Sequence, residues 1–320
     1  MYKAFYNLTR DPFEITPDPS FLFPTKRHNE ALAALYYGVR RHKGFVVLTG
    51  EVGTGKTLLL RCLLQLLKRN NDVSYAYVFN GRLTPTEFLQ YVAGDLGLPS
   101  SNKNKSELLL ELATHVITRA QKNLTTVLVV DEAHHLSTDI LEEIRLLTNL
   151  ETAQAKLLQI LLVGQPELDD KLDSVELRQL KQRIAFRSRL MPLDLNETRG
   201  YIERRLQLSG ANSHAATLFP PQTIAVLHRY TQGIPRLINT VCENALIAAY
   251  AKQIHAVTPS IIEDIAADFR LGVQSSWKED AAPLEGNDFR KAAKTLLDLY
   301  EYLQKPSARE AESAASVNKQ

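Results

Sequence analysis

The chain has 320 residues, of which 44% are hydrophobic and 23% charged, and its formal net charge at pH 7 is only +2. This length suggests about two domains, and the composition is that of an ordinary soluble protein. The near-neutral charge gives no strong electrostatic case for binding nucleic acid or membranes. No run approaches the roughly 18 apolar residues that span a bilayer, and no secretory leader is visible. We therefore expect a cytoplasmic protein without a transmembrane segment, in which Cys62 and Cys242 are buried thiols.

Strand and helix patterns alternate along residues 44–195, which predicts parallel βαβ units. Residues 127–130 are apolar without alternation, as expected of a strand covered on both faces. We expect an α/β fold, a parallel sheet sandwiched by helices. The predicted strands are 45–49, 73–79, 127–130, 157–163 and 186–193. The predicted helices are 58–67, 84–96, 106–121 capped by Ser106, 139–150 and 175–182.

The pattern is purely helical after residue 195, and Asn196 is the expected cap of the first of four helices. This predicts a small all-α lid domain. Farther on, apolar residues recur at helical spacing over 289–303, in a helix that either packs on the body or docks on a partner. The predicted divisions are 1–43 as a lead segment, 44–195 as the α/β domain, 196–270 as the lid, and 271–320 as linker, amphipathic helix and disordered tail.

The most informative motif lies between the strand 45–49 and the helix 58–67. It fits the phosphate-loop pattern G-x-x-x-x-G-K-[ST] at every fixed position, and a chance Gly-rich turn is the alternative. Backbone N–H groups of such a loop surround a phosphate, and the helix N-terminus favours negative charge. Lys56 would reach the β- and γ-phosphates and Thr57 would hold Mg²⁺. The loop reads Gly50-Glu51-Val52-Gly53-Thr54-Gly55-Lys56-Thr57.

The strand 127–130 ends in two carboxylates, Asp131 and Glu132, the Walker B pattern. We expect Asp131 to bind Mg²⁺ and Glu132 to polarise the attacking water. The alternative is a strand that ends in acids at a solvated turn. The run Asp-Glu-Ala-His from Asp131 to His134 also matches a helicase signature. We interpret that match as coincidental, because such a helicase needs a second domain for which no room remains.

Two polar residues follow neighbouring strands. Gln165 is placed to contact the γ-phosphate or the water, although a turn residue before Pro166 explains it equally well. Asn80 could hold Glu132 away from the water until a partner binds, or it is an ordinary turn residue before a glycine.

Three groups of basic residues are candidates for phosphate contacts. Arg236, in the first turn of the helix that Pro235 opens, could reach the γ-phosphate from the lid; a surface salt bridge is the alternative. Arg183 is the candidate for insertion into the active site of a neighbouring subunit, and charge complementing a helix C-terminus is the alternative. Residues 40–43 could touch nucleic acid, but are more often structural at the end of a helix.

In this order the motifs resemble those of the AAA+ ATPases, and more closely the general secretion pathway protein A (ExeA-type) branch, which is related to origin-recognition ATPases. The resemblance covers about residues 1–270. It implies a P-loop NTPase fold, with Gln165 as sensor 1, Arg236 as sensor 2 and Arg183 as the arginine finger. It also implies that the N-terminal segment helps to enclose the adenine. The opening marks are Phe5-Tyr6-Asn7-Leu8, Asp11-Pro12-Phe13, Thr16-Pro17-Asp18-Pro19, Phe21-Leu22-Phe23 and His28-Asn29-Glu30-Ala31-Leu32.

Secretion members of that branch continue into a transmembrane helix and a periplasmic domain. Relatives that lack these parts resemble ATPases of exosortase and polysaccharide-export systems, and we expect the chain to be of this kind. The expected function is Mg²⁺-dependent ATP hydrolysis by a homo-oligomer, a ring or a filament, which drives an envelope export or secretion system. The alternatives are a DNA-binding regulator of transposition and a signalling switch that does not hydrolyse ATP.

Overall fold

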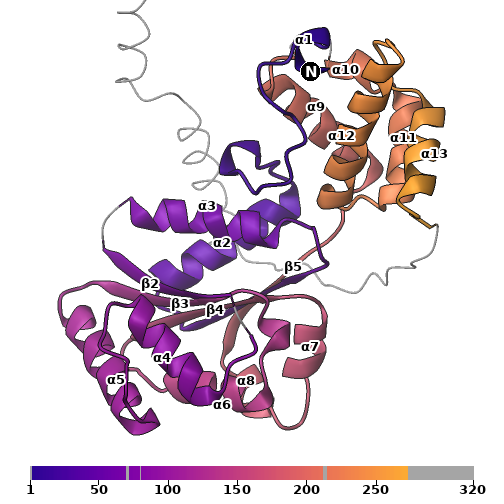
Figure 1. Cartoon of the computed structure of the whole chain (residues 1–320). Helices are drawn as coiled ribbons and strands as arrows, with labels where there is room; N and C mark the ends of the chain where they lie inside the picture. The colour runs from indigo at the N-terminus through magenta and orange to yellow at the C-terminus, as the bar shows by residue number, and fades with distance from the viewer. Residues whose placement is uncertain (1, 70–71, 80, 212–214, 273–320) are drawn as a thin grey trace, which may run out of the picture.

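A five-stranded parallel sheet organises the first part of the molecule (Figure 1). The computed structural model describes residues 2–69, 72–79, 81–211 and 215–272. The strand order is β2-β3-β4-β1-β5, so β1 lies between β4 and β5. This topology confirms the predicted parallel α/β fold. The strands are β1 (Phe45–Gly50), β2 (Val73–Val78), β3 (Thr125–Val130), β4 (Leu158–Gly164) and β5 (Ile184–Leu190).

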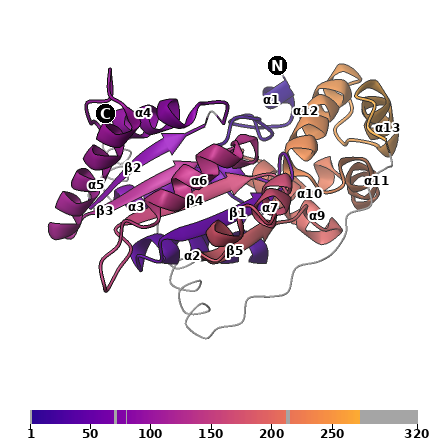
Figure 2. The same cartoon turned by 90° about the horizontal axis from the view of Figure 1, so that it is seen from below.

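Helices cover both faces of the sheet, with α2 and α3 on one face and α4 to α8 on the other (Figures 1 and 2). A second, all-helical part follows β5. Two short 3₁₀ turns, η1 (Pro19–Phe21) and η2 (Ala133–His135), lie between these elements. The helices are α1 (Tyr2–Phe5), α2 (Lys26–Arg40), α3 (Lys56–Lys68), α4 (Pro85–Asp95), α5 (Lys105–Gln121), α6 (Thr138–Leu147), α7 (Glu167–Leu172), α8 (Arg178–Lys181), α9 (Leu195–Leu208), α10 (Ala215–Leu218), α11 (Pro221–Thr231), α12 (Pro235–Ala251) and α13 (Pro259–Asp268).

Each central strand serves two hydrophobic cores, because successive side chains of a strand point to opposite faces. In β1, Phe45 and Val47 join the core beneath α4 to α8, whereas Val46 and Leu48 join the core beneath α2 and α3. All six residues of β1 and of β3 are buried. This explains why the sequence of these strands is apolar without alternation.

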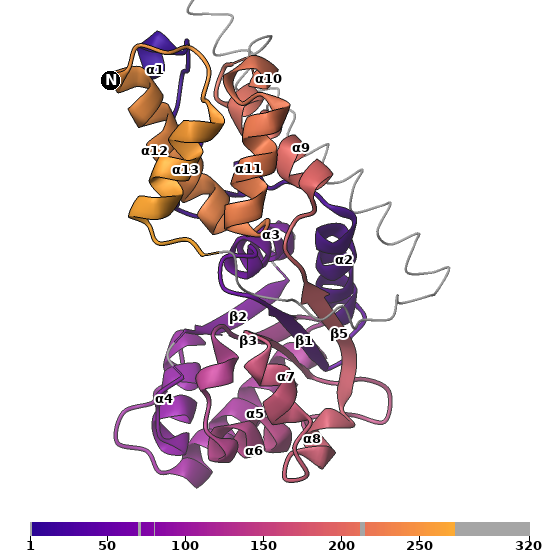
Figure 3. The ribbon, with the colours of Figure 1, turned by 90° about the vertical axis from the view of Figure 1, so that its right-hand side faces the viewer.

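The helical part has its own core, to which the start of the chain contributes (Figure 3). Tyr2, Tyr6 and Phe13 pack among the buried residues of α9, α11, α12 and α13. The chain then crosses to the sheet, where Leu22 and the buried face of α2 join the core beneath α2 and α3. The predicted lead segment is therefore shared between the two parts, and the predicted domain limits stay predictions.

Three predictions about helices are wrong in detail. The cap of α5 is Asn104 rather than Ser106, because Asn104 and Glu107 form a reciprocal capping box. The cap of α9 is Asp194 rather than Asn196 for the same reason, with Glu197 as its partner. The predicted helix 175–182 is the four-residue α8, and α7 before it was not predicted from the sequence.

Two further predictions lie outside the described residues, namely the role of Asn80 and the helix over 289–303. Within the described ranges, Cys62 and Cys242 are buried free thiols, as predicted. In the same part of the chain, none of the helices combines the length and the apolar character needed to cross a membrane.

Candidate nucleotide site

The phosphate loop connects the end of β1 to the start of α3, as the sequence predicts. Gly53 and Gly55 have φ angles of +83° and +98°, in the left-handed region where glycine is favoured. Within the described part of the chain, the backbone N–H groups of these two glycines have no acceptor. They lie at the N-terminus of a 13-residue helix, so the loop is suited to hold an anion.

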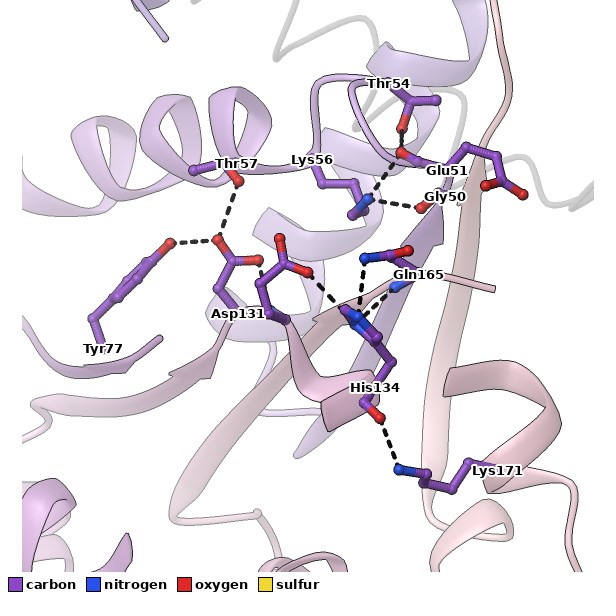
Figure 4. Close-up of polar contacts among 11 residues, drawn as sticks. Gly50, Glu51, Thr54, Lys56, Thr57, Tyr77, Asp131, His134, Gln165 and Lys171 are labelled. Atoms are coloured by element: carbon purple, nitrogen blue, oxygen red, sulfur yellow. Dashed lines mark hydrogen bonds and ion pairs between the residues drawn. The ribbon is translucent and has the colours of Figure 1, made fainter. Parts of the chain in front are cut away.

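Lys56 is the first residue of α3 and its side chain returns to the loop (Figure 4). Its Nζ donates to the carbonyl oxygens of Gly50 at 2.7 Å and Glu51 at 2.9 Å. Burial lowers the pKa of this ammonium, although nearby carboxylates, first Glu132 and then Asp131, act in the opposite direction. An ammonium has three donors, so one is left for a phosphate oxygen.

Thr57 and Asp131 meet between α3 and β3. The Thr57 hydroxyl donates to Oδ2 of Asp131 at 3.1 Å, and the Tyr77 hydroxyl donates to the same oxygen at 2.8 Å (Figure 4). Asp131 is only 5% exposed. The structure therefore brings together the two predicted Mg²⁺ ligands. It adds Tyr77 of β2, which the sequence analysis did not identify.

Glu132 follows Asp131 with a φ of +52°, and its backbone N–H donates to Oδ1 of Asp131 at 2.9 Å. This left-handed residue turns the chain sharply into η2. Its Oε2 lies 3.5 Å from Nδ1 of His134. Among the described residues, this buried oxygen has no hydrogen-bond partner of good geometry.

Gln165 follows β4, the strand that lies between β1 and β3, and its contact with a phosphate or a water stays a prediction. Its side-chain nitrogen lies 2.9 Å from Nε2 of His134 (Figure 4). Burial lowers the pKa of His134, with a smaller contribution from the adjacent His135. The sequence analysis did not identify His134 as a site residue. The signal that could have found it is its place as the fourth residue of the Asp-Glu-Ala-His run.

Ligand atoms of Glu132, His134 and His135 lie within 4.8 Å of one another. Such a group could hold a metal ion. However, Nε2 of His134 lies against the side-chain amide of Gln165, and Nδ1 faces the backbone N–H of Gln165 at 3.4 Å. We assign no metal to this group.

Arg236 approaches the phosphate loop from the helical part. Its backbone N–H donates to the carbonyl oxygen of Gly53 at 3.2 Å. A Cβ on Gly53 would lie 2.7 Å from Cβ of Arg236, so the two chains are closely packed. Within the described ranges, the exposed guanidinium of Arg236 makes no hydrogen bond or ion pair.

Arg183 is not brought to this site. It directly precedes Ile184, which pairs with Phe45 at the opposite end of β1 from the loop. The first and last residues of β1 are five positions apart, and at about 3.3 Å for each position its two ends are roughly 17 Å apart. The Arg183 guanidinium donates to the Thr148 hydroxyl at 2.7 Å. In its own subunit this arginine therefore lies far from the phosphate loop.

The lead segment supports the loop through His28 of α2. Its Nε2 lies 3.1 Å from the carbonyl oxygen of Thr54, and its Nδ1 lies 2.7 Å from the Thr25 hydroxyl. Because a carbonyl only accepts, the ring proton lies on Nε2 and Nδ1 accepts from Thr25. Burial lowers the pKa of His28, which favours this neutral form. Enclosure of an adenine by the lead segment stays a prediction.

The strand order, the phosphate loop after β1 and the two carboxylates after β3 define a P-loop protein of the AAA+ class. Residues 39–172 match the sequence family described as an AAA domain. Over 258 residues the chain is 44% identical to general secretion pathway protein A of Aeromonas hydrophila, covering 80% of this chain and 46% of that protein. Residues 39–172 therefore form an AAA domain, and over the matched residues the chain is related to general secretion pathway protein A. It spans less than half of that relative.

Solved structures show the same fold. The Aeropyrum pernix ORC2 protein, solved as ADPNP-ADP complexes, matches with a TM-score of 0.60 and 18% identity over 81% of this chain and 71% of that chain. Drosophila ORC bound to DNA matches with a TM-score of 0.62 and 19% identity over 82% of this chain and 65% of that chain. At these identities the likeness supports the fold alone.

Proposed function

We propose that this protein is a Mg²⁺-dependent ATPase that works as a homo-oligomer. The observation that carries the proposal is the meeting of Thr57 and Asp131, whose oxygens lie 3.1 Å apart beside the buried Lys56. Hydroxyl and carboxylate oxygens are ligands that suit Mg²⁺. The N–H groups of Gly53 and Gly55, which have no acceptor among the described residues, fit a phosphate.

The residues divide the work of hydrolysis. The loop and Lys56 bind the β- and γ-phosphates, while Thr57 and Asp131 hold Mg²⁺. When bound, Mg²⁺ would neutralise phosphate charge. Glu132 orients and polarises the attacking water, and Gln165 contacts the γ-phosphate or that water. Arg236 lies nearby with its guanidinium unengaged in the described part of the chain, and extends it to the γ-phosphate from the helical part.

Arg183 serves the neighbouring subunit in this proposal, because it lies too far from its own loop. Mixing two inactive variants tests this arrangement. Lys56→Ala lacks a working site but supplies Arg183, whereas Arg183→Ala has a working site and lacks the arginine. The mixture should recover ATPase activity that neither variant has alone. No recovery in the mixture would refute catalysis between subunits.

A second measurement separates this role from a structural one. Thr148→Val removes the hydrogen bond that Arg183 makes within its own chain. If Arg183 acts in the neighbouring site, Thr148→Val should keep most of the activity that Arg183→Ala loses. Wild-type activity should also rise faster than linearly with protein concentration. Strictly proportional activity would contradict oligomer-dependent hydrolysis.

We further propose that the ATPase drives an envelope export or secretion system, as the name of its curated relative suggests. Glu132→Gln should trap the ATP-bound oligomer with its partners, because the residue that polarises water is lost. Affinity capture with this variant should recover export proteins in an ATP-dependent way. Failure to recover them with ATP would contradict this role. The cytoplasmic location stays a prediction.

The alternative is a DNA-binding regulator. One neighbour in fold is an ORC bound to DNA. However, Arg40 pairs with Asp72 and Arg41 lies over the ring of Tyr37, so these members of the predicted basic cluster are engaged within the chain. We expect no strong DNA binding with ATP at low salt. Tight binding that weakens steeply as salt rises would favour the regulator instead.

A further inference from the structure

His134 has no part in the hydrolysis scheme above, yet it contacts two residues that do. Its side chain is only 7% exposed and lies between Glu132 and Gln165. Nδ1 faces Oε2 of Glu132 at 3.5 Å, and Nε2 faces the amide nitrogen of Gln165 at 2.9 Å. One imidazole thus lies between the segment that follows β3 and the segment that follows β4.

The link to Glu132 requires one particular tautomer. A carboxylate can only accept, so His134 can donate to Glu132 only when Nδ1 carries the proton, and Nε2 then accepts from the amide N–H of Gln165. Nδ1 lies 3.5 Å from Oε2 of Glu132 and 3.4 Å from the backbone nitrogen of Gln165, and both distances exceed the usual hydrogen-bond range. The Nδ1-protonated tautomer, in which the imidazole joins the two residues, is therefore part of the proposal that follows.

Further contacts restrain the position of His134. Nζ of Lys171 donates to the carbonyl oxygen of His134 at 2.7 Å (Figure 4). It also donates to the carbonyl oxygen of Leu136 at 2.7 Å. These bonds fasten η2 to α7. The ring also packs against that of His135, with centroids 3.9 Å apart. A side chain restrained in this way can transmit the position of one partner to the other.

We propose that His134 is a positioning residue that couples Glu132 to Gln165, so that the two take up their places for hydrolysis together. The inference rests on the proposed ATPase function and names one of its internal links. Engagement of a γ-phosphate by Gln165 is communicated to Glu132 through the imidazole. Without this link nucleotide still binds, but Glu132 is less often in the position from which it polarises the attacking water.

Substitutions at position 134 separate the two contacts. His134→Ala removes both, His134→Asn keeps a donor near the position of Nδ1, and His134→Gln keeps a polar atom near that of Nε2. We expect His134→Ala to lower kcat about tenfold, the loss expected for about 1.4 kcal/mol, with KM within about twofold of wild type. Each amide variant should recover part of kcat. His135→Ala removes only the ring that packs on His134 and should lower kcat less than His134→Ala, because the contacts with Glu132 and Gln165 remain.

A double variant tests the coupling itself. His134→Ala combined with Gln165→Ala should lose no more kcat than the more damaging single change, because both interrupt one link. Losses that multiply would overturn the proposal. So would a wild-type kcat in His134→Ala, or a KM that rises as much as kcat falls.

A measurement on nucleotide-free protein makes the outcome independent of catalysis. The ¹⁵N resonances of the His134 ring should show the Nδ1-protonated tautomer, and Glu132→Gln should shift them. The Nε2-protonated tautomer with no response to Glu132→Gln would overturn the proposed link. An inactive wild-type protein with the expected resonances would instead refute the ATPase function and leave the contact in place.

Discussion

Gly53→Ala tests how closely the helical part is tied to the phosphate loop. A methyl group on Gly53 would lie 2.7 Å from Cβ of Arg236 and 3.0 Å from Cγ2 of Ile234. Carbon atoms in favourable contact are about 3.5–4.0 Å apart, so α12 must retreat by about 1 Å. That movement stretches the 3.2 Å bond from Arg236 N to Gly53 O beyond hydrogen-bonding range. The lost bond is worth about 1 kcal/mol. Because this bond holds Arg236 beside the loop, we expect affinity for ATP to fall by up to the equivalent factor, roughly fivefold.

The backbone cost must be separated from this effect, because alanine at a φ of +83° also costs about 1–2 kcal/mol of stability. Gly97→Ala is the matched control, since Gly97 has a φ of +79° and no atom within 4 Å of an added Cβ. Both variants should lose similar stability in urea, but only Gly53→Ala should bind a fluorescent ATP analogue more weakly. Equal affinities for the two variants would refute the close contact as a determinant of binding.

Three further changes test other contacts. Tyr77→Phe removes a donor to Asp131 and should raise the Mg²⁺ concentration for half-maximal ATPase activity about tenfold, as losses of such outer partners do; an unchanged Mg²⁺ dependence would contradict it. Burial raises the pKa of Glu243, so its stabilising effect is present at low pH and is lost as pH rises through the folded-state pKa. The free energy of unfolding of Glu243→Gln, measured in urea, should therefore rise relative to that of wild type between pH 4 and pH 8. A difference between the two proteins that does not change with pH would refute this. Arg205→Met removes the 2.6 Å bond to the carbonyl oxygen of Pro12 and should lower the free energy of unfolding by about 1–3 kcal/mol; an unchanged midpoint in urea would show that this bond contributes little.

The sheet and most helices could be predicted because their signals are local. The apolar runs of β1, β3 and β4 differ plainly from the helical patterns between them. The start of α5 was predicted two residues too late, because Asn104 and Ser106 are both good caps and the capping-box spacing was overlooked. The residue that caps the helix is the one with a glutamate three residues later that completes a capping box, and Glu107 does this for Asn104. The packing of Tyr2 against the helical part has no local signal at all.

The site residues also divide into those with a local signal in the sequence and those without one. Lys56 and Thr57 belong to one contiguous motif, and parallel strands bring Asp131 to the same edge of the sheet as that motif. Tyr77 could not be identified, because its role depends on β2 lying beside β3 and on the register Tyr77↔Val129. His134 was set aside as part of a coincidental match. Only its distances to Glu132 and Gln165, which follow two different strands, distinguish it from other histidines after a strand.

The start of the chain also has a consequence for biosynthesis. Tyr2 completes its hydrogen bonds with Glu243, 241 positions later in the chain, and Tyr6 donates to the carbonyl oxygen of Ile254. The segment that emerges early from the ribosome must therefore wait, with its aromatic rings uncovered, until α12 has been made. Such long-range closure is slow and exposes the nascent polypeptide to aggregation. Chaperone demand during translation should accordingly fall when these rings are replaced by polar residues, even though the finished protein loses stability.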